Sequence, residues 1–269
     1  MNMRTFALAA CCAALAVPAL AGGLTDRIAA KFKVKATDTW FGGQRTIFDF
    51  NGYDAWVVEP PVGVKPLAGL PWTWTMQWRT AFVPRTSVPR LLKMGYCHVA
   101  IDTFKDHMDE NGLKVNKAFH DFLVADLGFA PKARLIGMSW GGFFSIRYAA
   151  AHPGDVAKIY LDAPLLNFEG FGGVPGHWSA TKPASGWAND PRMPVNMAPA
   201  LVKAEIPILL LYGGKDTVVP PDFNCRRFAA AYKAAGGKPQ NLKVVCRGSY
   251  EHHPHGVEVD ENTVIDFFR

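Results

Sequence analysis

The stretch ARLIGMSWGGFFSIRYAAA, residues 133–151, carries the strongest structural signal in the chain. Its first part, Ala133–Met138, predicts a buried strand, and Gly141–Ala151 predicts a helix that stops before His152-Pro153. Between them lies Gly-x-Ser-x-Gly, centred on Ser139, in the strand–turn–helix setting that this motif requires. The glycines allow a tight turn with the helix close to the strand, and the turn holds the serine hydroxyl exposed. The sequence therefore predicts Ser139 as a nucleophile.

Short apolar strands alternate with helices on both sides of this stretch. The predicted strands are 46–49, 55–59, 71–78, 97–102, 133–138, 158–161, 208–212 and 242–246. The predicted helices are 88–94, 116–127, 141–151, 222–235 and 261–268. This alternation predicts an α/β fold: a mostly parallel, doubly wound sheet with helices on both faces. Residues 164–200 are dense in Gly, Pro and Trp and predict a short insertion over the carboxyl edge of the sheet, where such folds bind ligands.

Composition limits the classes of protein that remain. The chain has 269 residues, 49% hydrophobic and 19% charged, with 29 Lys+Arg against 23 Asp+Glu for a net charge of +6. These values exclude a disordered, collagen-like or coiled-coil chain. The basic residues are scattered rather than gathered on one helix, which argues against a nucleic-acid partner. We expect one domain over residues 22–269.

The first 21 residues predict an export signal. Arg4 is followed by the apolar run Thr5–Leu20 and by Ala19-Leu20-Ala21, a small-residue cleavage pattern. The run is shorter than the ~20 residues that span a bilayer, which favours a cleaved signal over a membrane anchor. A lipoprotein signal ending at Cys11 is a weaker alternative. We expect a secreted or periplasmic protein without stable membrane insertion.

Three cysteines follow the predicted signal. Cys97 lies in an apolar run that predicts a core position, and Cys225 and Cys246 each adjoin an element near the end of the predicted sheet. An oxidising compartment favours disulfides, so we expect Cys225 and Cys246 to form a bridge. No Cys-x-x-Cys or His-Glu-x-x-His spacing suggests zinc, and no cofactor is expected.

A serine nucleophile needs a base, and the base needs an orienting carboxylate. Asp216 follows the predicted strand 208–212 in a glycine-rich turn, which places it at the carboxyl edge. Asp162 is the rival acid, and Asp102 is a less favoured one. The segment 251–256, Glu-His-His-Pro-His-Gly, offers His252, His253 and His255 as candidate bases. Pro254 and the close spacing make joint metal ligation by these histidines awkward.

These motifs together resemble the α/β-hydrolase superfamily, and within it secreted bacterial prolyl-oligopeptidase-like and acyl-esterase-like serine hydrolases. The resemblance covers roughly residues 45–268. The matching segments are Pro71-Trp72-Thr73-Trp74, Gly137–Gly142, Asp162-Ala163-Pro164, Gly213–Pro220 and His252-His253-Pro254-His255. The resemblance implies Ser139 as nucleophile, Asp216 as acid and His252 as base. Two positions depart from it, because Trp140 stands where relatives often have Arg and Glu251 replaces the glycine before the first histidine. The second departure keeps His253 and His255 open as alternatives.

The oxyanion donors are expected at two loops. The Trp140 amide directly precedes the predicted helix 141–151, whose N-terminus favours negative charge. The second donor is expected after the predicted strand 71–78, near Gln77 or Trp78. Trp74, Trp78, Trp178 and Trp187 are candidates for lining a substrate cleft, although Trp74 is equally compatible with the core.

The sequence therefore predicts a secreted serine hydrolase acting on a small-molecule or carbohydrate ester, most simply a carboxylesterase. A prolyl-oligopeptidase-like peptidase is the alternative within the same chemistry. A catalytically silent glycan-binding protein on the same fold is the alternative from another class.

Overall fold

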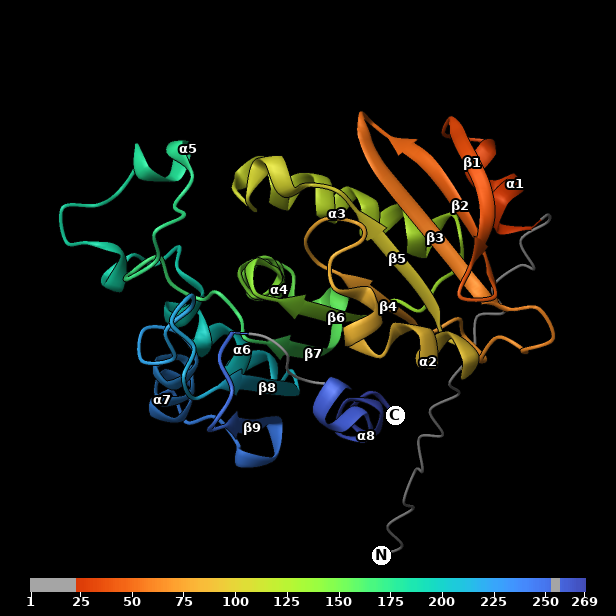
Figure 1. The fold of residues 1–269 in the computed structure, drawn as a ribbon. Coiled ribbons are helices and arrows are strands. Elements are labelled where there is room, and N and C mark those ends of the chain that lie inside the picture. The colour runs from red at the N-terminus through yellow and green to blue at the C-terminus, as the bar shows by residue number, and fades with distance from the viewer. Residues whose placement is uncertain (1–22, 253–256) are drawn as a thin grey trace, which may run out of the picture.

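A computed structural model describes residues 23–252 and 257–269 of the chain. Within these residues, nine strands form one twisted sheet with the order β1-β2-β3-β5-β4-β6-β7-β8-β9 (Figure 1). The strands are β1 (Val34–Trp40), β2 (Gly43–Phe50), β3 (Tyr53–Pro61), β4 (Trp72–Thr75), β5 (Cys97–Ile101), β6 (Ala133–Met138), β7 (Val156–Asp162), β8 (Ile208–Gly213) and β9 (Leu242–Arg247). Pairing is antiparallel from β1 to β3 and between β3 and β5, and parallel from β5 to β9.

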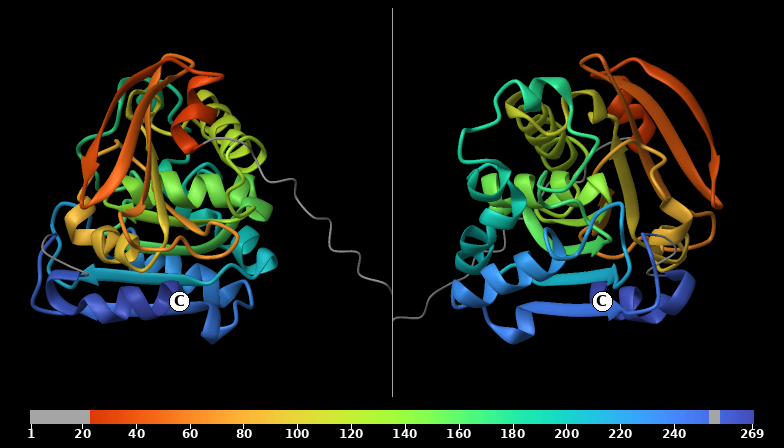
Figure 2. Two further views of the ribbon diagram at one scale, coloured as in Figure 1. Left: turned by 90° about the vertical axis from the view of Figure 1, so that its right-hand side faces the viewer. Right: turned by 60° about the vertical axis from the view of Figure 1, so that its left-hand side comes forward.

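Helices cover both faces of the sheet (Figure 2). The α-helices are α1 (Leu24–Ala29), α2 (Val88–Lys93), α3 (Glu110–Ala125), α4 (Trp140–Ala151), α5 (Gly176–Ser179), α6 (Ala198–Ala204), α7 (Cys225–Ala234) and α8 (Val257–Phe268). Short 3₁₀ helices are η1 (Val83–Thr86), η2 (Phe104–Asp106), η3 (Pro153–Asp155), η4 (Trp187–Asn189), η5 (Pro194–Asn196) and η6 (Pro239–Asn241). The predicted mostly parallel sheet with two helical layers is confirmed.

The central strands explain this arrangement, because their apolar side chains alternate between two cores. In β8, Ile208 and Leu210 belong to the core that holds α3, α4 and α7, whereas Leu209 and Leu211 belong to the core that holds α2 and α8. Successive residues of a strand point to opposite faces. A strand that is apolar at every position is therefore buried on both sides.

The insertion predicted over residues 164–200 follows β7 and contains α5, η4 and η5. The arrows of β6 and β7 in Figure 1 point toward the side on which this segment lies. The insertion therefore stands at the carboxyl edge of the sheet, where the loops after the parallel strands meet.

Some predicted boundaries differ from the structure. The strand predicted over 71–78 is only β4, Trp72–Thr75, because the chain turns into a loop at Met76. Helix α3 starts at Glu110 rather than near 116, since the Asp109 side chain caps it by accepting from the Gly112 amide at 2.9 Å. Strand β1 was not predicted, because its five central residues are exposed and give no apolar alternation.

The predicted disulfide between Cys225 and Cys246 is wrong in this structure, where both are free thiols. Cys225 is packed in the main core at the start of α7, whereas Cys246 is exposed on β9, in register with Tyr212 of β8. The two side chains therefore occupy different environments. Cys97 lies in the core, as predicted.

We expect Cys246 to be the thiol that alkylates in the folded protein among Cys97, Cys225 and Cys246. Burial raises the pKa of Cys97 to about 12 and also raises that of Cys225, so both should react only after unfolding. Peptide mapping after native and denaturing alkylation checks this. A non-reduced peptide that joins Cys225 to Cys246 would contradict it.

The predicted export signal lies outside the described residues and stays a prediction. None of the helices in residues 23–252 and 257–269 is long and apolar enough to span a membrane.

Candidate active site

Ser139 occupies the sharp turn between β6 and α4. Its backbone has φ 54° and ψ −118°, an uncommon conformation for a residue other than glycine. The turn is fixed on both sides, because the Ser139 amide donates to the Asp162 carbonyl at 3.0 Å and its carbonyl accepts from Leu165 at 2.8 Å. The surrounding hydrogen bonds thus hold the strained backbone that presents the side chain.

The glycines of the segment Gly137–Gly142 are required by close packing. A Cβ at Gly137 would lie 2.4 Å from the carbonyl oxygen of Gly141, and one at Gly142 would lie 2.2 Å from the Cβ of Pro164. Both approaches are too short for any side chain. The first turn of α4 is therefore wedged between β6 and the start of the insertion.

His252 lies between Ser139 and Asp216. Its Nε2 is 3.1 Å from the Ser139 Oγ, and its Nδ1 is 2.7 Å from Oδ2 of Asp216. The three residues come from the turns after β6, β8 and β9, three strands that lie close together in the sheet. The structure therefore brings together the serine, acid and base that the sequence predicted.

Asp216 is fixed by the backbone of its own loop. Its side chain is only 1% exposed, and its Oδ1 accepts from the amides of Val218 at 2.9 Å and Val219 at 2.8 Å. This leaves Oδ2 for the imidazole. An ionised carboxylate can only accept, so Nδ1 of His252 carries the proton and Nε2 is available to accept one from the serine hydroxyl.

The loops that carry Asp216 and His252 are joined directly. The Gly214 amide donates to the Arg247 carbonyl at 3.0 Å, and the Lys215 amide donates to the Tyr250 carbonyl at 2.9 Å. A Cβ at Gly214 would meet the Gly248 carbonyl at 2.8 Å. These contacts fix the imidazole relative to the carboxylate.

The side chains of the rival acids make other contacts. Asp162 is fully buried, and its Oδ2 accepts from the Tyr160 hydroxyl at 2.6 Å. Asp102 accepts from the Phe104 amide at 3.2 Å and begins the loop after β5. His253 and His255, the alternative bases, lie outside the described residues.

Two backbone amides remain candidates for binding an oxyanion. Trp140 is the first residue of α4, so its N–H has no acceptor within the helix. Gln77 follows β4 and is 2% exposed, and the carbonyl oxygen of Met76 would lie 2.9 Å from a Cβ at Gly141. The loop after β4 thus packs against the first turn of α4, which brings Gln77 beside the serine turn.

The predicted cleft tryptophans divide into two groups. Trp74 is fully buried in the core, and Trp178 and Trp187 are 3% and 4% exposed in the insertion. Trp78 is partly exposed and packs edge-on against Phe104, with ring centroids 5.2 Å apart.

Sequence reasoning missed other rings that surround Trp140. Phe104 and His107 from the loop after β5 lie 5.9 and 5.0 Å from its ring, and Phe171 from the insertion lies 5.6 Å away. These residues lie in loops that follow strands β5 and β7, and that position in the sequence could have identified them as candidates for lining the site.

The comparisons with known proteins agree with this architecture. The family model for the alpha/beta hydrolase fold matches residues 109–186, which include the serine turn. No curated protein matches the chain significantly. Est1E from Butyrivibrio proteoclasticus has a TM-score of 0.60 at 18% identity, over 83% of this chain and 97% of its own.

Two further solved structures are similar in fold. Dipeptidyl peptidase 4 of Porphyromonas gingivalis has a TM-score of 0.60 at 13% identity and covers 88% of this chain, but this chain spans only 36% of that protein. S-formylglutathione hydrolase of Agrobacterium tumefaciens has a TM-score of 0.56 at 14% identity, over 88% of this chain and 97% of its own. Sheet order, family match and neighbours together show that the chain has the α/β-hydrolase fold.

Proposed function

We propose that this protein is a serine hydrolase that cleaves carboxylic esters. The observation that supports it is the unbroken hydrogen-bonded series from Asp216 through His252 to Ser139, at 2.7 and 3.1 Å. Such a series lets the imidazole take the hydroxyl proton as the serine attacks a carbonyl. The buried and doubly hydrogen-bonded Asp216 orients the imidazole and stabilises it when it becomes charged.

The proposed reaction has two halves. In the first, Ser139 Oγ bonds to the ester carbonyl carbon while its proton passes to His252 Nε2, and the tetrahedral oxyanion accepts from the amides of Trp140 and Gln77. The carbon–oxygen bond to the alcohol then breaks, and the alcohol leaves with the proton from His252. In the second half, water attacks the acyl-serine with His252 again as base, which releases the acid. Each oxyanion donor contributes ~3 kcal/mol to the transition state.

We expect a fluorophosphonate to label the wild-type protein and not the Ser139→Ala variant, because the reagent needs an activated serine. Ser185→Ala serves as the matched control, since Ser185 is exposed in the insertion and should leave labelling unchanged. Labelled protein is measured by intact mass. A folded wild-type protein that takes up no label would favour the silent glycan-binding alternative.

Hydrolysis rates separate the esterase from the peptidase within this chemistry. Short alkyl esters and aminoacyl anilides are compared at equal concentration with the same enzyme. Faster cleavage of the esters is the expected result. Exclusive cleavage of the anilides would assign the site to a peptidase.

A further inference from the structure

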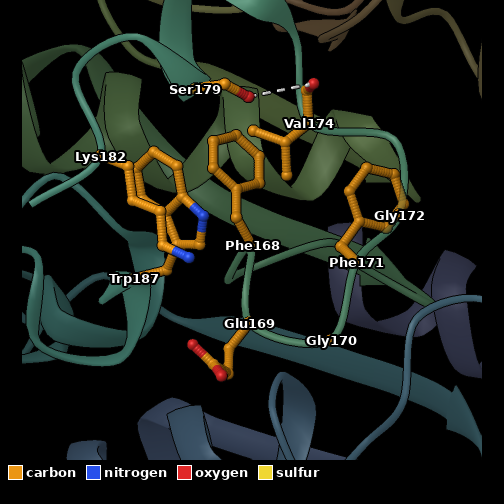
Figure 3. Close-up of a pocket in the computed structure, with 9 residues that line it drawn as sticks. All are labelled: Phe168, Glu169, Gly170, Phe171, Gly172, Val174, Ser179, Lys182 and Trp187. Carbon is orange, nitrogen blue, oxygen red and sulfur yellow. Dashed lines mark hydrogen bonds between the residues drawn. The ribbon is translucent and has the colours of Figure 1, made fainter.

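The insertion contains an open cavity of about 430 Å³. Its walls include the side chains of Phe168, Phe171 and Trp187, with Glu169 and Lys182 also lining it. Figure 3 shows the two phenyl rings and the indole grouped together, with the Glu169 carboxylate extending away from them. The volume lies within the range of small-molecule sites, roughly 300–1,000 Å³.

Two rings that line this cavity pack against the residue that follows Ser139. The ring of Trp140, the residue after Ser139, lies 5.7 Å from the Phe168 ring and 5.6 Å from the Phe171 ring. Both phenylalanines line the cavity. A molecule seated there would therefore contact rings that pack against the residue after Ser139.

The cavity wall is held in place by buried contacts. Oδ1 of Asn224 accepts from the amides of Leu166 at 2.7 Å and Asn167 at 2.9 Å, and Oδ1 of Asn167 accepts from the Glu169 amide at 3.1 Å. The Phe168 ring stacks on Phe143 of α4 with centroids 4.8 Å apart. Because these contacts fix the backbone in advance, a ligand would lose little affinity to ordering the wall.

The lining combines the partly exposed Phe171 ring and the nearly buried Phe168 and Trp187 rings with two charges of opposite sign. Among the described residues, neither the Glu169 carboxylate nor the Lys182 ammonium forms an ion pair or a side-chain hydrogen bond. A purely apolar ring would cover the aromatic groups but offer nothing to these two charges. A sugar ring has an apolar C–H face for the aromatic groups and hydroxyls that can donate to the carboxylate and accept from the ammonium.

We propose that this cavity is a sugar-binding subsite, which holds the carbohydrate part of an acylated sugar while its ester carbonyl lies at Ser139. The subsite deepens the proposed function and rests on it. Phe171 is a partly exposed wall residue, and Lys182 is an exposed cation that also lines the cavity. Neither belongs to the proposed catalytic machinery.

Binding is tested first, without any need for turnover. The Ser139→Ala protein is titrated with methyl glucopyranoside and observed by saturation-transfer NMR. We expect the Ser139→Ala protein to bind this sugar. Adding Phe171→Ala or Lys182→Ala should raise its Kd about tenfold. The exposed and distant Phe41→Ala and Lys132→Ala are the matched controls and should not change it.

Kinetics then compare a monoacetylated methyl glucopyranoside with ethyl acetate. In an otherwise wild-type enzyme, Phe171→Ala and Lys182→Ala should raise KM for the sugar ester about tenfold and leave ethyl acetate hydrolysis unchanged. If the variants lose activity equally on both esters, or on neither, the subsite proposal is wrong. The proposed ester hydrolysis is not contradicted by that result. A selective loss on ethyl 3-phenylpropanoate instead of the sugar ester would also overturn it, in favour of an apolar ring. Sugar binding that responds to Phe171→Ala without hydrolysis of any ester would overturn the proposed function and leave the subsite in place.

Discussion

His252→Ala should lower kcat for a short alkyl ester by about 10⁶-fold, the order of loss seen when the base of a serine hydrolase is removed. The reason is geometric, because Nε2 of His252 is the atom that the structure places 3.1 Å from the Ser139 hydroxyl. Without it, the serine must lose its proton to water during attack. Initial rates with wild-type and variant protein measure the effect.

His253→Ala and His255→Ala provide matched controls within the same segment. We expect each to change kcat/KM less than about tenfold, since neither should replace the bond that His252 makes. Thermal unfolding of all three variants separates a catalytic loss from a folding defect. An active His252→Ala together with an inactive His255→Ala would transfer the role of base to His255.

The fold could be predicted from the sequence wherever burial requires a pattern of apolar residues or glycines. Strand β8 is apolar at every position from Ile208 to Tyr212, and the glycines of the serine turn stand where an added Cβ would lie only 2.2 and 2.4 Å from neighbouring atoms. Strand β1 has no such pattern, because it is an exposed edge strand whose stability comes from pairing with β2. Its residues therefore carried no signal that could be read in advance.

The residue types of the candidate site and their order along the chain could be predicted from the sequence. The choice of Asp216 over Asp162 as the acid could not. Sequence offered Asp216 and Asp162 at the ends of adjacent strands, and only the loop geometry turns one of them toward His252. The cysteine prediction failed for a related reason. Sequence position near the same sheet edge did not reveal that Cys225 is buried while Cys246 is exposed.

Asp216→Asn should lower kcat by about 10³- to 10⁴-fold with little change in thermal stability. Oδ1 of Asp216 accepts two backbone amides, so the oxygen of an asparagine is required at that place and its NH₂ group faces Nδ1 of His252. Nδ1 must then accept a hydrogen bond. The proton consequently moves to Nε2, where the imidazole donates toward Ser139 and cannot take its proton.

Asp162→Asn is the matched control at the rival acid, where the amide oxygen can still accept from the Tyr160 hydroxyl. If Asp162→Asn lowers kcat by 10³-fold or more (about 4 kcal/mol) while Asp216→Asn remains active, Asp162 rather than Asp216 is the acid. A double variant tests whether the groups act as one unit. Once Ser139→Ala has removed the nucleophile, adding Asp216→Asn should cost less than about tenfold, because the carboxylate acts only through the imidazole that activates that serine.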